Sequence, residues 1–222
     1  MGDLLVRAAE VSRVFGSDAS PVEAVVEATF VIRHGDRIAL VGPSGSGKST
    51  LLHLIAALDR PTSGSIEWPA FGPPEVLRPG PVAVAFQGSS LLPPLTVVEN
   101  VELPVLLDDG SAADARSQAE RLIGVFELGE VSAKLPEEIS AGQAQRAAVA
   151  RALTGSPRLV LADEPTGQQD RGGAQRVMRS ILAETERTGA ALVVATHDPS
   201  VAALLSHRWE VDGGRLRTAV PV

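Results

Sequence analysis

The chain of 222 residues has no cysteine and no tyrosine, and aromatic residues make up only 3% of it. The absence of cysteine excludes disulfides and thiolate metal sites. The histidines are dispersed and do not have the spacing of a zinc site. With so few aromatic side chains, the core must be built from Val, Leu, Ile and Ala.

A positive net charge is also lacking, because the 27 Asp and Glu outnumber the 20 Lys and Arg and the formal net charge is −7. Sequence-independent binding to nucleic acid relies on clustered Lys and Arg, so no nucleic-acid partner is expected. No apolar run approaches the length of a membrane span, and the most apolar stretch, 91–107, is interrupted by prolines and acids. The N-terminus, MGDLLVRAAE, has an early acid and no signal-peptide pattern. We therefore expect a soluble, cytoplasmic chain.

Short strand-like runs alternate with helix-like segments, which predicts a mainly parallel sheet covered on both sides. Strands are predicted at 4–11, 22–32, 37–41, 82–86, 158–163 and 192–196, helices at 51–58, after Ser140 and at 172–189, and a β-hairpin at 209–217. The β-rich N-terminus suggests a small antiparallel sheet beside the parallel one. Segment 91–137 would be a helical insertion, in which Ser111 is expected to cap a helix.

Residues 42–49 read GPSGSGKS and match G-x-x-x-x-G-K-[ST] between a strand and a helix. Glycines allow backbone N–H groups to curl around an anion, and the following helix directs its positive end toward the same place. The Lys48 ammonium can pair with β- and γ-phosphates, and the Ser49 hydroxyl can ligate Mg²⁺. The loop therefore predicts a nucleoside triphosphate site.

Two acids follow a buried strand in LVLADEP, residues 159–165. The carboxyl ends of parallel strands form the ligand edge of such a sheet. Asp163 would hold Mg²⁺ directly or through water, and Glu164 would polarise an attacking water.

Other nucleotide-binding classes fit the sequence less well. A GTPase would need N-K-x-D to read guanine, but the only asparagine is Asn100, and valine follows it. A small-molecule kinase fits the phosphate loop alone. It gives no role to ISAGQAQR, residues 139–146, where Ser140 can cap a helix that begins with small residues.

In this order, the motifs resemble those of the ABC-type ATPases, the nucleotide-binding subunits of ABC transporters. After the phosphate loop, Gln87 resembles the Q-loop glutamine, and ISAGQAQR resembles the signature motif usually written LSGGQ. LVLADEP resembles the Mg²⁺ strand with the catalytic glutamate, and TGQQD (166–170) resembles the D-loop. His197 resembles the switch histidine. Phe15 resembles the aromatic residue that stacks on adenine. LDRPTSG, LLPPLTVVENVELP and ADEPTG look most like the lipoprotein-release and macrolide-efflux subgroup.

The resemblance implies one P-loop ABC-ATPase domain over 1–222, with a helical subdomain at about 91–140. It implies catalytic roles for Lys48, Gln87, Glu164 and His197, and Mg²⁺ ligation by Ser49, Gln87 and Asp163. The positions that it implies for ATP are Phe15, Gly42, Pro43, Ser44, Gly45, Ser46, Gly47, Lys48, Ser49, Thr50, Ser140, Ala141, Gly142, Gln143 and Asp170.

The resemblance also implies partners. Two subunits would pack head to tail, with each ATP between the phosphate loop of one and the signature helix of the other. A separate transmembrane permease would hold the dimer at the inner face of the cell membrane. The alternatives are a soluble ABC protein of repair, translation or assembly, and a regulatory cassette that hydrolyses ATP poorly.

The sequence departs from the family pattern at two positions in these motifs. Ala141 replaces the first of the paired signature glycines, and Gln169 stands where the family usually has Leu. If position 141 needs a positive φ or a very close phosphate, its methyl group would weaken hydrolysis without abolishing it. The segment 64–87 is also short and proline-rich for the subgroup, which suggests an unusual membrane partner.

Overall fold

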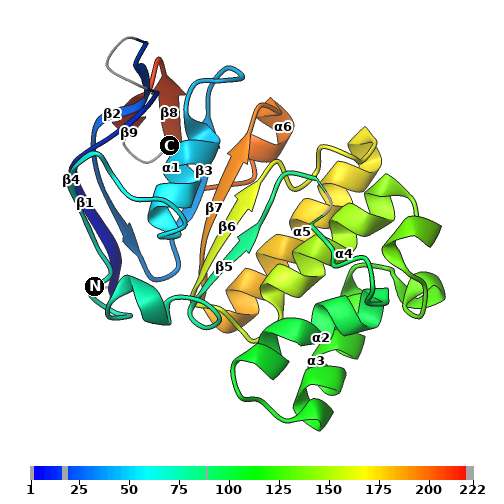
Figure 1. The fold of residues 1–222 in the computed structure, drawn as a ribbon. Coiled ribbons are helices and arrows are strands. Elements are labelled where there is room, and N and C mark those ends of the chain that lie inside the picture. Colours follow the sequence, from blue (N-terminus) through cyan, green and yellow to red (C-terminus); the bar gives the residue numbers. More distant parts are fainter. Residues whose placement is uncertain (1–2, 17–19, 89, 219–222) are drawn as a thin grey trace. The chain divides into compact units, whose positions relative to one another are not determined.

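The computed structural model describes residues 3–16, 20–88 and 90–218 (Figure 1). Contacts divide the chain into two compact units, Met1–Leu77 with Ala191–Val222, and Arg78–Ala190. The first unit is therefore discontinuous in sequence, whereas the second is one continuous segment.

The first unit is a mixed sheet with two α-helices and a short 3₁₀ helix, Pro74–Val76, among its described residues. Its elements are β1 (Leu4–Phe15), β2 (Val22–Arg33), β3 (Arg37–Val41), α1 (Lys48–Ile55), β4 (Ser63–Glu67), β7 (Ala191–Thr196), α6 (Pro199–Ala202), β8 (His207–Asp212) and β9 (Arg215–Thr218). The strands lie in the order β4-β1-β2-β9-β8-β3-β7. β1 is antiparallel to β2 and β4, whereas β3 is parallel to β7 and β8. The predicted combination of an N-terminal antiparallel part and a parallel part is confirmed.

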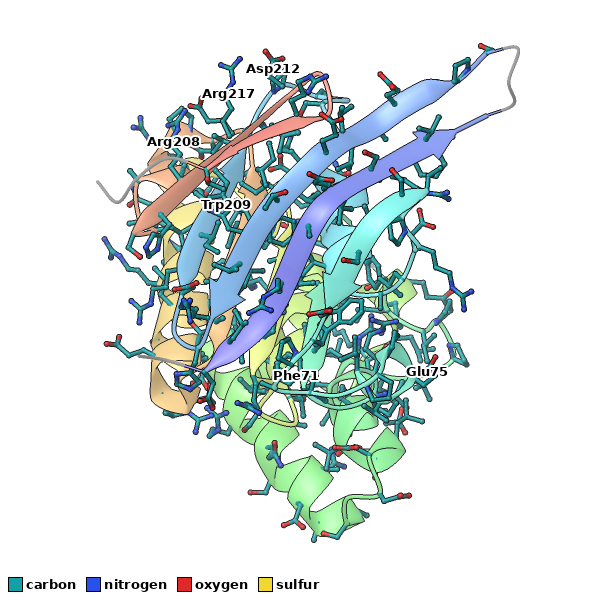
Figure 2. The ribbon with its side chains drawn as sticks, turned by 90° about the vertical axis from the view of Figure 1, so that its left-hand side faces the viewer. Phe71, Glu75, Arg208, Trp209, Asp212 and Arg217 are labelled. Carbon is teal, nitrogen blue, oxygen red and sulfur yellow. The ribbon has the colours of Figure 1, made fainter. Side chains whose placement is uncertain are left out.

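Burial explains why these runs form strands. Every residue of β7, ALVVAT, is buried, as expected for a strand covered on both faces. β8 carries Trp209, which is labelled in Figure 2. The centroid of its ring lies 5.1 Å from that of Phe30 on β2. The turn after β8 uses Gly213 and Gly214, with φ of 51° and 76°, which suits a two-residue hairpin. The predicted hairpin is confirmed.

The second unit contains two parallel strands and a group of helices. Its elements are β5 (Val82–Ala85), α2 (Val97–Leu107), α3 (Ala112–Val125), α4 (Ala141–Leu153), β6 (Leu159–Asp163) and α5 (Arg171–Thr188). α2 packs against α3 and α4 (Figure 1). Ser111 caps α3 by accepting the Asp114 N–H, as predicted. The apolar face of α3 is fully buried and consists of Ala115, Ala119, Leu122 and Ile123, with Phe126 just beyond it.

A charge cluster joins α3 to α5. Glu184 is only 7% exposed and accepts from Arg121 at 2.7 Å and from Arg187 at 3.1 Å. Burial raises the pKa of the Glu184 carboxyl, but the hydrogen bonds and charges of the two guanidinium groups outweigh it, so the net pKa is lower than usual. Glu184 therefore stays ionised at neutral pH and links the two helices.

Asn100, the residue that excluded guanine recognition, has a structural role. Its side chain is fully buried in α2, where Oδ1 accepts the Leu92 N–H at 2.7 Å. Its amide also donates to the carbonyls of Leu92, Leu95 and Thr96 at 2.9–3.1 Å. One side chain thus satisfies the backbone hydrogen-bonding groups of the non-helical segment that leads into α2.

Within the described ranges, no helix is long and apolar enough to cross a membrane.

Candidate functional site

The phosphate loop connects β3 to α1 in the first unit. Gly42 and Gly47 have φ of 155° and 107°. A Cβ added at Gly42 would lie 2.1 Å from the Val211 carbonyl oxygen, and one added at Gly47 would lie 2.0 Å from the Ala24 carbonyl oxygen. Only glycine fits at these two places, because the loop packs directly on the backbone of neighbouring strands. The loop is therefore shaped by the sheet beneath it.

Lys48 is the first residue of α1 and is only 8% exposed. Its ammonium donates to the carbonyls of Gly42 and Pro43, both at 2.9 Å. These neutral acceptors hold the positive charge across the start of the loop. A phosphate is a stronger acceptor for an ammonium than a carbonyl, so an anion in the loop could take over these bonds.

His197 follows β7 and is exposed beside the start of the phosphate loop. It lines a cavity of about 440 Å³ with Val41, Gly42, Pro43, Asp198, Pro199, Ala202, Arg208, Glu210, Val211 and Asp212. The structure thus brings together two motifs that are far apart in sequence. Arg208 and Asp212, labelled on β8 in Figure 2, add charge to this cavity. Sequence reasoning missed them because a strand of alternating charged residues gives no signal for a site.

Phe15 ends β1 with a ring that is 40% exposed. The Arg13 guanidinium lies 4.3 Å from the ring centroid and is itself held by Asp59 at 2.8 Å. A cation therefore covers one face of the ring. A stacked base would have to use the opposite face.

The two predicted acids lie in the second unit, at the end of β6. Asp163 is the last residue of this strand and is 6% exposed. Glu164 follows with a φ of 47°, in the left-handed region that non-glycine residues rarely adopt. Gln87 lies exposed just beyond β5, the parallel neighbour of β6. The acids and Gln87 thus follow the carboxyl ends of paired strands, as the sequence predicted.

The signature segment begins α4 with a complete capping box. Ser140 Oγ accepts the Gln143 N–H at 3.2 Å, and Gln143 Oε1 accepts the Ser140 N–H at 2.9 Å. Ala141 is the first helical residue and has ordinary helical backbone geometry. Position 141 therefore does not need a positive φ, and alanine is not strained there. Asp170, predicted to contact nucleotide, caps α5 by accepting the Gly173 N–H at 2.6 Å.

We expect the Ala141→Gly variant to keep ATP turnover within about twofold of the original protein, because alanine is not strained at this position. Glycine at the start of a helix should instead lower the unfolding free energy by about 1 kcal/mol or less. Steady-state ATPase rates and chemical denaturation would measure the two effects. A several-fold gain in turnover would show that the methyl group does impede the phosphate.

Two glutamines that sequence reasoning did not assign connect α4 to the segment after β6. Gln145 donates to the Glu164 carbonyl and accepts the Gln168 N–H. Gln169, the departure from the usual Leu, donates to the Gly142 carbonyl at 2.8 Å. Gln145 lies within the signature segment ISAGQAQR, but nothing in that segment sets its amide apart from the other glutamine.

Ser49, Gln87 and Asp163 offer a hydroxyl, an amide and a carboxylate oxygen, which are the hard ligands that Mg²⁺ prefers. Within the described residues, no group of three or more His, Cys, Asp or Glu could hold a metal by itself. A single carboxylate supplemented by substrate phosphates is the usual protein arrangement for Mg²⁺. Each of the three side chains therefore offers an oxygen of the kind that Mg²⁺ binds.

A glycine-lined loop between a parallel strand and a helix, with its lysine at the helix start, defines a P-loop nucleotide-binding protein. A profile described as ABC transporter matches residues 25–167. The chain belongs to the ABC transporter ATPase family, and it is an ATP-binding and ATP-hydrolysing subunit of the kind that powers transport.

The curated relatives and solved structures agree with this family. The lipoprotein-releasing system ATP-binding protein LolD of Geobacter metallireducens is 37% identical, over 96% of this chain and 97% of that protein. LolD of Legionella pneumophila (strain Paris) is 38% identical, over 91% and 92%. A dimeric post-hydrolysis state of the ATP-binding cassette MJ0796 bound to ADP and Pi has a TM-score of 0.89 and 31% identity, over 97% of this chain and 98% of that chain.

Proposed function

We propose that two copies of this chain close head to tail around ATP and drive a separate membrane permease of the lipoprotein-releasing type. The observation that carries the proposal is that two helices begin at motif residues, α1 directly after the phosphate loop and α4 after its Ser140 cap, and such helix N-termini favour anions. The similarity to the ATP-binding proteins of lipoprotein-releasing systems and the dimeric state of the MJ0796 cassette support it.

In this assembly each ATP is held from two sides. The loop of one copy wraps the phosphates and Lys48 pairs with the β- and γ-phosphates. Ser140 of the second copy donates its hydroxyl hydrogen to the γ-phosphate. Its Oγ already accepts the Gln143 N–H, but an accepting hydroxyl still carries a hydrogen to donate. The positive end of α4 adds to the attraction.

The remaining motif residues perform the hydrolysis. Glu164 orients and polarises the attacking water, and His197 contacts the γ-phosphate. Ser49, Gln87 and Asp163 would hold Mg²⁺. When bound, this ion neutralises charge that develops on the phosphates. Phe15 would support the adenine with its uncovered face.

We assign the docking surface for the permease to a groove in the second unit. The groove has a volume of about 520 Å³ and is lined by Arg78, Pro79, Gly80, Val82, Ala83, Val84, Phe86, Ser90, Leu92, Leu103, Pro104, Leu107, Arg151, Ala152 and Thr154. Phe86, Leu92 and Leu107 are each at least 36% exposed, which is typical of a surface that another protein covers. Its occupant in this proposal is a cytoplasmic helix of the permease.

The groove also offers a route from the permease to the nucleotide. Phe86 lies in the groove and directly precedes Gln87, so a helix pressed on this ring would act on the adjacent Q-loop position. Arg151 lies in the same groove and donates to Ser90 at 2.7 Å. Burial lowers the pKa of its guanidinium, which nevertheless stays charged, so an acidic side chain on the permease helix would be favoured here.

The Leu107→Asp variant tests this assignment. We expect it to lose co-purification with a co-expressed multispan permease of the lipoprotein-releasing type, because it places a charge in an apolar contact. Its ATP binding should be unchanged. Leu58→Asp is the matched control, since Leu58 is 43% exposed, lies in the first unit and does not line the groove. Equal recovery of the permease with both variants would contradict the assignment.

A further inference from the structure

Gln145 connects α4 to the chain that follows β6. Its side chain is 2% exposed and uses both ends of its amide on backbone groups. Nε2 donates to the Glu164 carbonyl at 3.0 Å, and Oε1 accepts the Gln168 N–H at 2.9 Å. One buried side chain therefore fixes both ends of the turn that begins at the proposed catalytic glutamate.

The backbone of Glu164 needs such support. Its φ of 47° strains a non-glycine residue, and such strain persists only where the surroundings determine the conformation. The Glu164 carbonyl accepts a second hydrogen bond, from the Gly167 N–H at 3.1 Å. Since φ and ψ set the direction of the Cα–Cβ bond, the bonds to this carbonyl also determine where the Glu164 carboxylate emerges.

The chemistry of position 145 suits this task. The buried residues next to Gln145 on the same face of α4 are apolar, namely Ala148 and Val149 one turn further on. A buried amide in such surroundings is costly unless both ends are hydrogen-bonded, and here both ends are. Methionine would fill the same volume without either bond, and glutamate would retain only the acceptor.

We propose that Gln145 is a positioning residue for ATP hydrolysis, which acts by holding the Glu164 backbone so that its carboxylate meets the attacking water. The inference rests on the role proposed above for Glu164. The plainer reading is that Gln145 only satisfies buried backbone groups. The two readings differ in what happens to turnover when the fold is intact, because a displaced catalytic group lowers kcat even in a folded protein.

The Gln145→Met variant separates them. We expect kcat to fall about 10- to 100-fold while KM for ATP stays within about twofold, measured well below the melting temperature. Gln118→Met is the matched control, because the Gln118 amide also accepts a backbone N–H, that of Gly155 at 3.1 Å, outside the motif residues. This control should keep its kcat. Should Gln145→Met not fold, Gln145→Glu serves instead, since it keeps the size and the acceptor but not the donor.

A double variant tests whether Gln145 acts through Glu164. Gln145→Met combined with Glu164→Gln should hydrolyse ATP no more slowly than Glu164→Gln alone in single-turnover assays, because the group that Gln145 positions is already gone. Gln145→Met with a kcat within twofold of the original, or a double variant slower than Glu164→Gln, would overturn the inference alone. Full activity of Glu164→Gln would instead overturn the proposed role of Glu164, and this inference with it.

Discussion

Replacing Glu164 with Gln is expected to give a protein that binds ATP and dimerises stably but hydrolyses ATP about 10²- to 10⁴-fold more slowly. The amide keeps the size of the side chain but cannot take a proton from water. The hydrogen bonds of the Glu164 carbonyl to Gln145 and Gly167 involve the backbone, so the substitution leaves them in place. The closed state should therefore accumulate, because the reaction that opens it is blocked.

Size-exclusion chromatography with MgATP would show the dimer, and phosphate release would show the loss of turnover. Glu130→Gln is a suitable control, because Glu130 is exposed in the second unit and belongs to no motif. It should hydrolyse ATP like the original protein. A Glu164→Gln protein that remains monomeric at high protein and ATP concentrations would count strongly against closure around nucleotide.

The Lys48→Ala substitution should have the opposite effect on binding. It removes a nearly buried ammonium, and a hydrogen bond to a charged group is worth about 1.5–3 kcal/mol, so affinity for ATP should fall roughly 10- to 100-fold. Hydrolysis should fall with it, and no ATP-dependent dimer should form. The carbonyls of Gly42 and Pro43 also lose their shared donor, which loosens the loop.

Titration with a fluorescent ATP analogue would measure the affinity, and a melting curve would show that the variant is folded. Lys134→Ala provides the control, because this lysine is exposed and lies outside the motifs. Unchanged nucleotide affinity in Lys48→Ala would mean that the ammonium keeps its bonds to Gly42 and Pro43 when ATP is bound. Together, the Glu164 and Lys48 variants separate binding from chemistry.

Much of the site could be predicted because its signals are local. The phosphate loop needs glycines at fixed places, a buried strand followed by acids is readable within a few residues, and a serine before small residues indicates a cap. The fold class also followed from alternating strand and helix patterns. The predicted ends of the helices were less accurate. The apolar run suggested a helix at 51–58, whereas α1 spans Lys48–Ile55.

The rest depends on contacts between distant parts of the chain. Nothing near Gln145 in the sequence shows that its amide meets Glu164 and Gln168. The left-handed φ of Glu164 could not be predicted either, because glutamate has no preference for that region. The permease groove likewise gathers residues from β5, α2 and α4, whose individual patterns indicate only ordinary core and surface.

The supports of the phosphate loop have a consequence for how the protein is made. Gly42 packs on the Val211 carbonyl, and the Ser46 carbonyl accepts the Gly214 N–H at 3.0 Å. These supports belong to the hairpin of β8 and β9, so the loop leaves the ribosome long before they exist. The second unit, Arg78–Ala190, is by contrast continuous and is synthesised whole before β7. Since domains fold as units during synthesis, a nascent chain acquires its finished ATP cradle only after the hairpin of β8 and β9 has been made.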